Sequence, residues 1–186
     1  MNLYIKYLLF ISLFLHLAAG LYNPLYALLV ESLGGSIIDV GVSFSIMPFV
    51  IACGLLVSGR FTDHYKNETL LLVIGYLIKT IAFFSFIFVT SVAELIIIQV
   101  LFGVSYVIST PAYESFFSKN LVKGKFASNW ASWESTTHFA AGVSAIAGGF
   151  LLATLGFKQL FMVTALLSFA GLVVSIALNL KVRATN

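Results

Sequence analysis

Six long apolar stretches follow one another along the chain, each bounded by charged residues, glycine or asparagine. None of them alternates apolar and polar positions with a period of two, as a strand of a membrane β-barrel would. Each is long enough to cross ~30 Å of hydrocarbon, which takes about 20 helical residues. Because backbone groups in hydrocarbon must be hydrogen-bonded within their own segment, the pattern predicts six membrane-spanning helices. They cover approximately Tyr7–Val30, Ile38–Val57, Leu70–Val89, Glu94–Phe117, Ala131–Leu155 and Leu160–Leu180.

The composition excludes a water-soluble fold. Of the 186 residues, 60% are apolar and only 9% are charged, whereas an ordinary soluble domain has roughly 25% charged residues. The mean hydropathy of +1.05 also indicates lipid as the solvent. Six spans with short loops use nearly the whole length, so we expect one all-α transmembrane domain over residues 1–186. The single cysteine, Cys53, cannot form an internal disulfide.

Positive charges gather on one side of the predicted membrane. The loops and ends on that side hold eight cations, whereas the other connections hold only Lys158. The positive-inside rule therefore predicts that both termini are cytoplasmic, and we expect the cell (inner) membrane as the location. The eight are Lys6, Arg60, Lys66, Lys119, Lys123, Lys125, Lys181 and Arg183.

A weak internal repeat links the first and fourth spans. Span 1 contains Asn23-Pro24-Leu25-Tyr26, and span 4 contains Thr110-Pro111-Ala112-Tyr113-Glu114. If the six helices form two inverted triplets, these spans are counterparts, and each has a proline-broken turn in its second half. Interrupted helices at matching repeat positions indicate the binding region of a transporter. The alternative is that proline is simply common in membrane helices.

Span 5 carries small residues at helical spacing. Thr137, Ala141, Ala145 and Gly149 recur every four residues, and Ser144 with Gly148 forms the adjoining stripe. Small residues at this spacing let two helices approach closely, so Ala141, Ala145, Gly148 and Gly149 are predicted to pack against a neighbour. A fixed contact and a sliding contact would use the same residues.

The loop between spans 2 and 3 resembles a family signature. It reads Gly59-Arg60-Phe61-Thr62-Asp63-His64-Tyr65-Lys66-Asn67. Gly59, Phe61, Thr62 and Asp63 match the cytoplasmic signature of the major facilitator superfamily, whereas the basic second half of that signature is eroded. Gln99 to Ser105 is similar to the family's fourth helix, with Gln99 in place of an arginine, and Gly142 to Gly149 resembles its glycine-rich fifth helix.

The resemblance covers all 186 residues, but as one half of the usual twelve-helix transporter with its 3+3 inverted repeat. It implies a membrane transporter that passes a small solute by alternating access, with a second six-helix half, identical or not, across a central cavity. Asp63 would be the gate residue that bridges to the other half. We expect a dimer of halves; the alternatives are a non-transporting membrane assembly module and a fragment of a longer transporter.

Candidate cavity residues lie at depth in the spans. Counting ~1.5 Å per residue, His16, Lys79 and His138 lie roughly 15 Å from the cytoplasmic edge, and Tyr106 and Ser109 are close to that level. The family resemblance implies a cavity lined by spans 1, 2, 4 and 5. The predicted lining groups are His16, Asn23, Tyr26, Tyr106, Ser109, Tyr113 and His138.

Lys79 is the most informative of the ionisable residues predicted deep in the membrane, because no carboxylate is predicted at its depth. An ionisable residue in a bilayer usually faces the bundle interior or a wet cavity. Three interpretations remain open: Lys79 extends toward an interface, it pairs with an acid, or it faces an anionic substrate.

Two acids are candidates for ion or proton coupling. Glu134 and His138 share a helical face and could exchange a proton, and Glu114 is comparable. The alternative is that Trp130 and Trp133 belong to the interfacial aromatic belt. Glu134 would then pair with a loop lysine, which is Lys119, Lys123 or Lys125. Gln99 weakens the case for proton antiport, because many proton antiporters of the family have an arginine there.

The sequence contains no enzyme signature. We find no phosphate-binding glycine-lysine loop, no paired cysteines and no metal-ligand spacing, so we expect neither enzymatic activity nor a metal or other cofactor. The basic residues are scattered over short loops, which gives no support to nucleic-acid binding. The expected partners are the lipid bilayer, a second six-helix half and a small-molecule solute.

Overall fold

The computed structural model describes residues 2–65 and 67–185, apart from the side chains of Arg60, Phe61 and Asp63. This part of the chain is helical and contains no strand, which confirms the all-α fold class. Its elements in chain order are α1 (Leu3–Tyr22), η1 (Asn23–Leu25), α2 (Tyr26–Ser32), α3 (Ile37–His64), α4 (Glu68–Ser85), η2 (Phe86–Phe88), α5 (Val92–Lys119), α6 (Phe126–Leu155) and α7 (Phe157–Arg183).

Six helical units in the described chain are long and apolar enough to cross a membrane. The first unit combines α1, η1 and α2, the third combines α4 and η2, and the others are single helices. They match the six predicted spans, but several continue into the polar flanks. Helix α3 runs to His64, for example, and α6 begins at Phe126. A helix can continue beyond the hydrocarbon because its backbone bonds lie within the segment.

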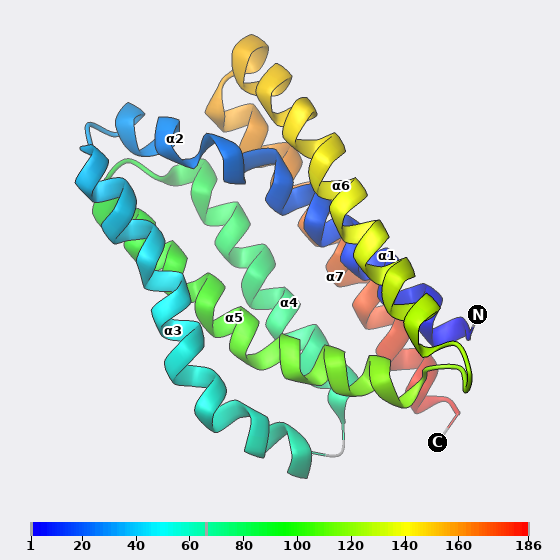
Figure 1. Cartoon of the computed structure of the whole chain (residues 1–186). Helices are drawn as coiled ribbons and strands as arrows, with labels where there is room; N and C mark the ends of the chain where they lie inside the picture. The colour runs from blue at the N-terminus through cyan, green and yellow to red at the C-terminus, as the bar shows by residue number, and fades with distance from the viewer. Residues whose placement is uncertain (1, 66, 186) are drawn as a thin grey trace.

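The helices pack as two groups of three. Helix α1 packs against α6 and α7, and α5 packs against α3 and α4. Figure 1 shows α6 running alongside α1 and α3 alongside α5. Contacts between α4 and α7 join the two groups.

This packing scheme has the symmetry of an inverted repeat. If the first three spans are exchanged for the last three, the α1–α6 contact becomes the α5–α3 contact, and α1–α7 becomes α5–α4. The α4–α7 contact is unchanged by the exchange. Span 1 and span 4 cross the bundle in opposite directions, since an odd number of spans separates the start of one from the start of the other. The architecture is therefore that of a six-helix bundle of the major facilitator type.

Only one of the two predicted proline breaks is present. Pro24 lies in the 3-10 turn η1, which separates α1 from α2. Pro111, by contrast, lies inside a continuous α5, and Pro48 lies inside α3. The predicted break in span 4 is therefore wrong. A proline removes one backbone donor, and within a packed membrane bundle a helix tolerates this loss without ending.

Small residues set the closest helix contacts. A Cβ placed on Gly148 of α6 would collide with the backbone carbonyl of Leu21 on α1, and one on Gly20 would collide with Ser144. The contact stripe of α6 is thus Ala140, Ser144 and Gly148, which are all buried. Gly149 has open space beside it, so its predicted packing role is wrong; the pattern misplaced the stripe by one position. Ala141 contributes its backbone to the contact with Gly20, and Ala145 is half-buried.

The two ends of the described chain meet at one end of the bundle, which we call the terminal end (Figure 1). The hydroxyls of Tyr4 and Thr185 are 3.1 Å apart. Nearby, the amide of Asn2 donates to Oδ1 of Asn120 over 3.2 Å. The loops between α3 and α4 and between α5 and α6 are therefore at the same end as both chain ends.

Candidate functional site

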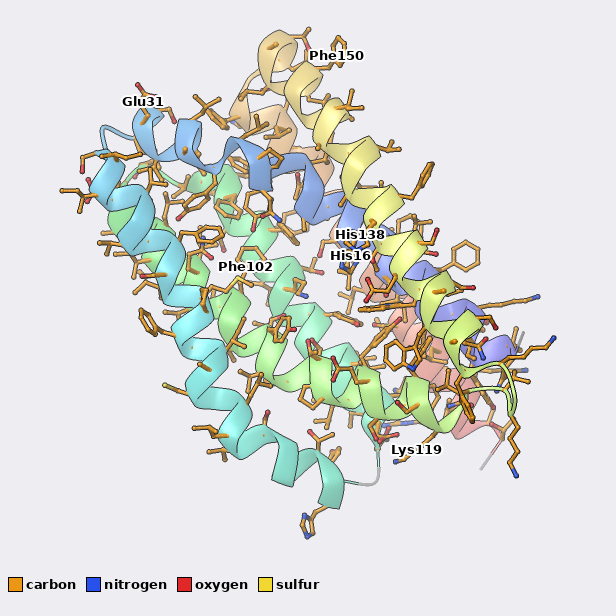
Figure 2. The ribbon with its side chains drawn as sticks, in the orientation of Figure 1. His16, Glu31, Phe102, Lys119, His138 and Phe150 are labelled. Atoms are coloured by element: carbon orange, nitrogen blue, oxygen red, sulfur yellow. The ribbon has the colours of Figure 1, made fainter. Side chains whose placement is uncertain are left out.

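A cavity of about 310 Å³ lies between the two groups of helices. Side chains from five of the six spans line it, whereas the family resemblance implied only spans 1, 2, 4 and 5. The additional span is α4. Figure 2 marks His16 on α1 and Phe102 on α5, which come from the two groups and both line the cavity. The polar and charged lining residues are Ser12, His16, Tyr22, Asn23, Tyr76, Lys79, Gln99, Tyr106, Ser109, Thr110, Tyr113, Glu114 and Trp133.

Lys79 brings a positive charge to this cavity. Its Nζ lies 5.6 Å from the centre of the Tyr76 ring, a cation–π contact between two cavity-lining residues. Among the described residues no carboxylate forms an ion pair with it. Of the three interpretations, pairing with an acid is therefore not what the structure describes, whereas extension to an interface and an anionic substrate remain predictions.

His16 lies on α1 at the same cavity. Its Nδ1 is 2.8 Å from the carbonyl oxygen of Ser12, one turn earlier in the helix. A carbonyl can only accept, so Nδ1 carries the proton and donates it. Nε2 is then an acceptor in the neutral ring and a donor in the charged ring.

Ser12, Tyr113 and Trp133 form an ordered hydrogen-bond chain in the wall. Tyr113 donates its hydroxyl proton to the carbonyl of Leu8 over 3.0 Å. Because each hydroxyl has one proton, Ser12 must donate to Tyr113 over 2.8 Å and accept from Nε1 of Trp133 over 2.9 Å. Trp133 is thus held inside the bundle, and Trp130 packs on Phe117 with ring centres 4.7 Å apart. The place of both rings in an interfacial belt remains a prediction.

Aromatic rings form the apolar wall. Tyr22, Phe83 and Phe102 are buried and contact one another edge-on or stacked, with ring centres 4.8 to 6.3 Å apart. Gln99 of α5 lines the same part of the cavity. It is only 2% exposed. Sequence reasoning treated Gln99 only as a departure from the family; a polar residue in an apolar span was the available signal.

The structure brings most of the predicted cavity residues together. His16, Asn23, Tyr106, Ser109 and Tyr113 all line the cavity, although solute binding by them remains a prediction.

Two predicted residues do not reach the cavity. Tyr26 is buried between helices and donates its hydroxyl to Ser43 over 2.8 Å. The side chain of His138 is 83% exposed on the outside of α6, where Nε2 lies 3.2 Å from the Glu134 carboxylate. The assignment of Tyr26 to the cavity wall is therefore wrong. His138 does not line the cavity of this six-helix unit, and its place in a cavity shared with a second half remains a prediction.

The predicted coupling acids occupy different surroundings. Glu114 lines the cavity and is exposed. Glu134 pairs with His138 and not with Lys119.

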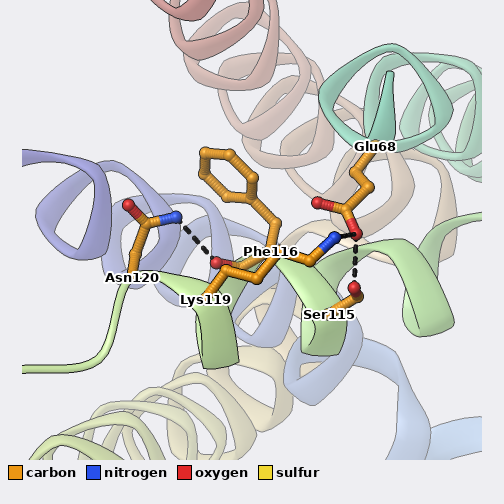
Figure 3. A network of polar contacts seen from close by, with 5 residues as sticks. All are labelled: Glu68, Ser115, Phe116, Lys119 and Asn120. Atoms are coloured by element: carbon orange, nitrogen blue, oxygen red, sulfur yellow. Dashed lines mark hydrogen bonds and ion pairs between the residues drawn. The ribbon is translucent and has the colours of Figure 1, made fainter. Parts of the chain in front are cut away.

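Lys119 instead contacts Glu68, at the terminal end. Its Nζ lies 2.7 Å from the Glu68 carboxylate, which also accepts from Ser115 (Figure 3). The next residue, Asn120, donates its amide to the carbonyl of Phe116 over 2.8 Å (Figure 3). This network fixes the start of α4 against the last turn of α5.

The signature loop can be placed only in part. Gly59 and Thr62 lie in the last turns of α3, and Thr62 is buried. The side chains of Phe61 and Asp63 lie outside the described residues. The gate role of Asp63 therefore remains a prediction.

The residues described by the structure contain no group of three His, Cys, Asp or Glu side chains that could hold a metal ion. The cavity is lined by one cation (Lys79), one carboxylate (Glu114), one imidazole (His16), several hydroxyls and an aromatic wall. Such a set can bind a small solute by charge, hydrogen bonds and apolar contact.

Comparison with known proteins gives the family. No curated protein matches the chain. The family model described as Major Facilitator Superfamily matches residues 8–185, which is nearly the whole sequence. The match agrees with the six apolar helices, and the molecule is an integral membrane protein in contact with the lipid bilayer. The chain belongs to the Major Facilitator Superfamily of membrane transporters.

Proposed function

We propose that this six-helix unit pairs with a second six-helix half and carries a small solute across the membrane by alternating access. The observation that carries the proposal is the cavity of about 310 Å³, which is lined by five spans and combines charged, hydroxyl and aromatic side chains. A site of this composition inside a transporter-family fold is a site for a small molecule.

The least covered helices support the presence of a second half. Helices α3 and α6 are symmetry counterparts in the packing scheme, and both present large apolar side chains outward. A second half seated on both helices would enclose the cavity between two six-helix units. The outward apolar side chains include Ile38, Phe49 and Leu56 on α3 and Phe139, Ile146 and Phe150 on α6.

Alternating access requires the two halves to rock against each other around the solute. By resemblance to the family, Asp63 at the end of α3 would bridge to the other half when the terminal end is closed. The excess of lysine and arginine at the terminal end supports a cytoplasmic placement of both chain ends.

Cross-linking tests the pairing. The native Cys53 is exposed on α3, so two copies that face each other through α3 should be joined by a bismaleimide in vesicles that contain only this chain. The matched control is Val173→Cys in a Cys53→Ala background, because Val173 is exposed on α7. Equal cross-linking at the two positions, or a strict monomer, would contradict the pairing.

Flux into vesicles tests the transport. The purified chain is reconstituted, and uptake is measured for a panel of radiolabelled sugars, amino acids, carboxylates and amines. We expect uptake of at least one member, its loss in Asp63→Asn, and its retention in Asp39→Asn, since Asp39 is bonded to Ser36 at the start of α3. A protein that is folded in vesicles and moves no member of the panel would contradict the proposal.

A further inference from the structure

The cavity contains a positive charge that has no counter-charge at its own depth. Glu68 and Lys119 are in contact, so they mark one level at the terminal end. Lys79 is eleven residues farther along α4 than Glu68, which is ~16 Å deeper at ~1.5 Å per residue. Glu114 is only five residues from Lys119, or ~8 Å from that level. The acid therefore lies nearer the terminal end, and no ion pair joins it to Lys79 in the described chain.

The groups near the depth of Lys79 can donate hydrogen bonds, and the carboxylate that lines the cavity, Glu114, lies nearer the terminal end. By the same count, Tyr106 and Ser109 of α5 lie near the depth of Lys79, and both line the cavity. His16 lines the same cavity, and its Nδ1 already donates to the carbonyl of Ser12. Glu134 and His138 of α6 form their own pair and do not line the cavity.

The part of the cavity farther from the terminal end than Lys79 is aromatic. Tyr22, Phe83 and Phe102 form its wall, and the buried Gln99 lines the same part of the cavity. A bound molecule would therefore meet a cation at one end and apolar rings, with one amide, at the other.

We propose that the solute is a small organic anion whose carboxylate pairs with Lys79 and whose apolar body lies against Tyr22, Phe83 and Phe102. An ammonium group held away from bulk water is costly unless an opposite charge accompanies it. An entering carboxylate supplies that charge and forms a charge-assisted hydrogen bond. A neutral molecule of the same shape gains only the apolar contact. This inference rests on the proposed transport function and names the substrate class of its cavity.

Ligand-induced stabilisation of the purified chain in uncharged detergent tests the inference. The probes are benzoate, phenylacetate and indole-3-acetate, each compared with its own neutral amide. A ligand that binds the folded state raises the melting temperature by mass action. We expect at least one carboxylate to bind about tenfold to a hundredfold more tightly than its amide, which is the range for a hydrogen bond to a charged group.

Variants connect the preference to Lys79. Lys79→Met keeps the length of the side chain, removes the charge and should abolish the difference between acid and amide. Lys79→Arg retains the charge and should retain the preference. Lys158→Met is the control, because Lys158 is exposed in the first turn of α7. The inference is overturned if the amides match their acids across the panel, or if the preference survives in Lys79→Met.

A second measurement does not depend on the choice of ligand. Trp133 lines the cavity, and Trp130→Phe makes it the only tryptophan. Iodide should quench its fluorescence less in Lys79→Met than in the Lys79 protein, whereas neutral acrylamide should quench both equally. Equal iodide quenching in the two proteins would contradict a positive cavity, and it would do so even if Lys79→Met bound no probe.

The tests of the substrate class and of transport can fail separately. Uptake of a sugar or an amine that depends on Asp63, with no preference for anions, would leave the proposed function standing and overturn the inference. Binding of carboxylates through Lys79 without uptake of any solute would do the reverse.

Discussion

Helices α4 and α7 differ sharply from α3 and α6 in how far the bundle covers them. In the most apolar window of each span, 44% of the residues are buried in both α4 and α7, but only 6% in α3 and 17% in α6. All four are apolar sequences of membrane-spanning length. Apolar composition therefore places a helix in the membrane and does not say which of its faces meets another helix.

Polar side chains, mostly with hydroxyl groups, join α4 to α7. Thr80 of α4 meets Ser168 of α7 over 3.0 Å, and Thr69 donates to Asn179 over 2.9 Å. On the open face of α6, by contrast, the hydroxyl of Thr154 bonds only its own helix, at the carbonyl of Phe150. Lipid is as apolar as leucine, so helices associate through close packing and polar contacts between them.

The largest loss of stability should come from adding a side chain at a glycine where two helices are in close contact. Gly148→Ala would place a methyl group against the backbone of Leu21 and separate α1 from α6, at a cost of about 3 kcal/mol in the free energy of unfolding. Gly149→Ala, one position along the same helix, has open space and should cost nothing. Denaturant titration in micelles measures both. Equal losses would show that α6 has no distinct packed face.

A smaller loss is expected from an aromatic side chain in the core. Phe161 of α7 is 2% exposed and stacks on Phe86 with ring centres 4.8 Å apart. Phe161→Ala should cost about 2 kcal/mol, because the cavity term remains while the transfer term is small when the unfolded helix stays in lipid. Phe169→Ala is the matched control, since Phe169 is exposed on the same helix. A comparable loss in the control would contradict the assignment of faces.

The ion pair at the terminal end should contribute less. Lys119→Met removes the partner of the Glu68 carboxylate and should cost about 1 kcal/mol, because the lysine side chain is mostly exposed to water. High salt should reduce the difference between the two proteins. Lys123→Met, at an exposed position in the following loop, should leave the midpoint unchanged. A larger loss at Lys123 would exclude a specific contact at Lys119.

The smallest effect should come from a single hydroxyl between helices. Thr80→Val removes the contact with Ser168 and should cost about 0.6 kcal/mol, the average for such bonds in a membrane bundle. Thr154→Val removes a hydroxyl that bonds only its own helix and should have no effect. If both variants lose the same stability, the hydroxyl contributes through its own helix and not through the contact between α4 and α7.

The sequence predicted the number and placement of the spans because the bilayer imposes a length and an apolar composition on every crossing. It predicted less well which way a residue points. Tyr26 was assigned to the cavity wall, yet it is buried between helices and donates its hydroxyl to Ser43. Gly149 was chosen within the correct pattern but on the neighbouring stripe. Such errors of orientation arise because lipid and the neighbouring helices have nearly the same polarity. The sequence of an apolar span therefore does not show which of its faces meets lipid and which meets protein.

Lys79 illustrates the opposite case. Its depth and the absence of an acid at that depth were readable from the sequence, and the structure brings it to the cavity. What the sequence could not supply was the contribution of α4 to the wall, which depends on how α4 and α5 pack against each other. The network of Glu68, Lys119 and Ser115 was missed for the same reason, since its members lie far apart in the chain.

The contact between Tyr4 and Thr185 has a practical consequence for protein engineering. Because both ends of the bundle's chain emerge together, two copies can be joined in tandem by a flexible linker that never crosses the lipid. The fused copies would share one orientation, and a substitution could then be introduced into either copy alone. Such single-chain fusions would show how many intact lysines at position 79 one working particle requires.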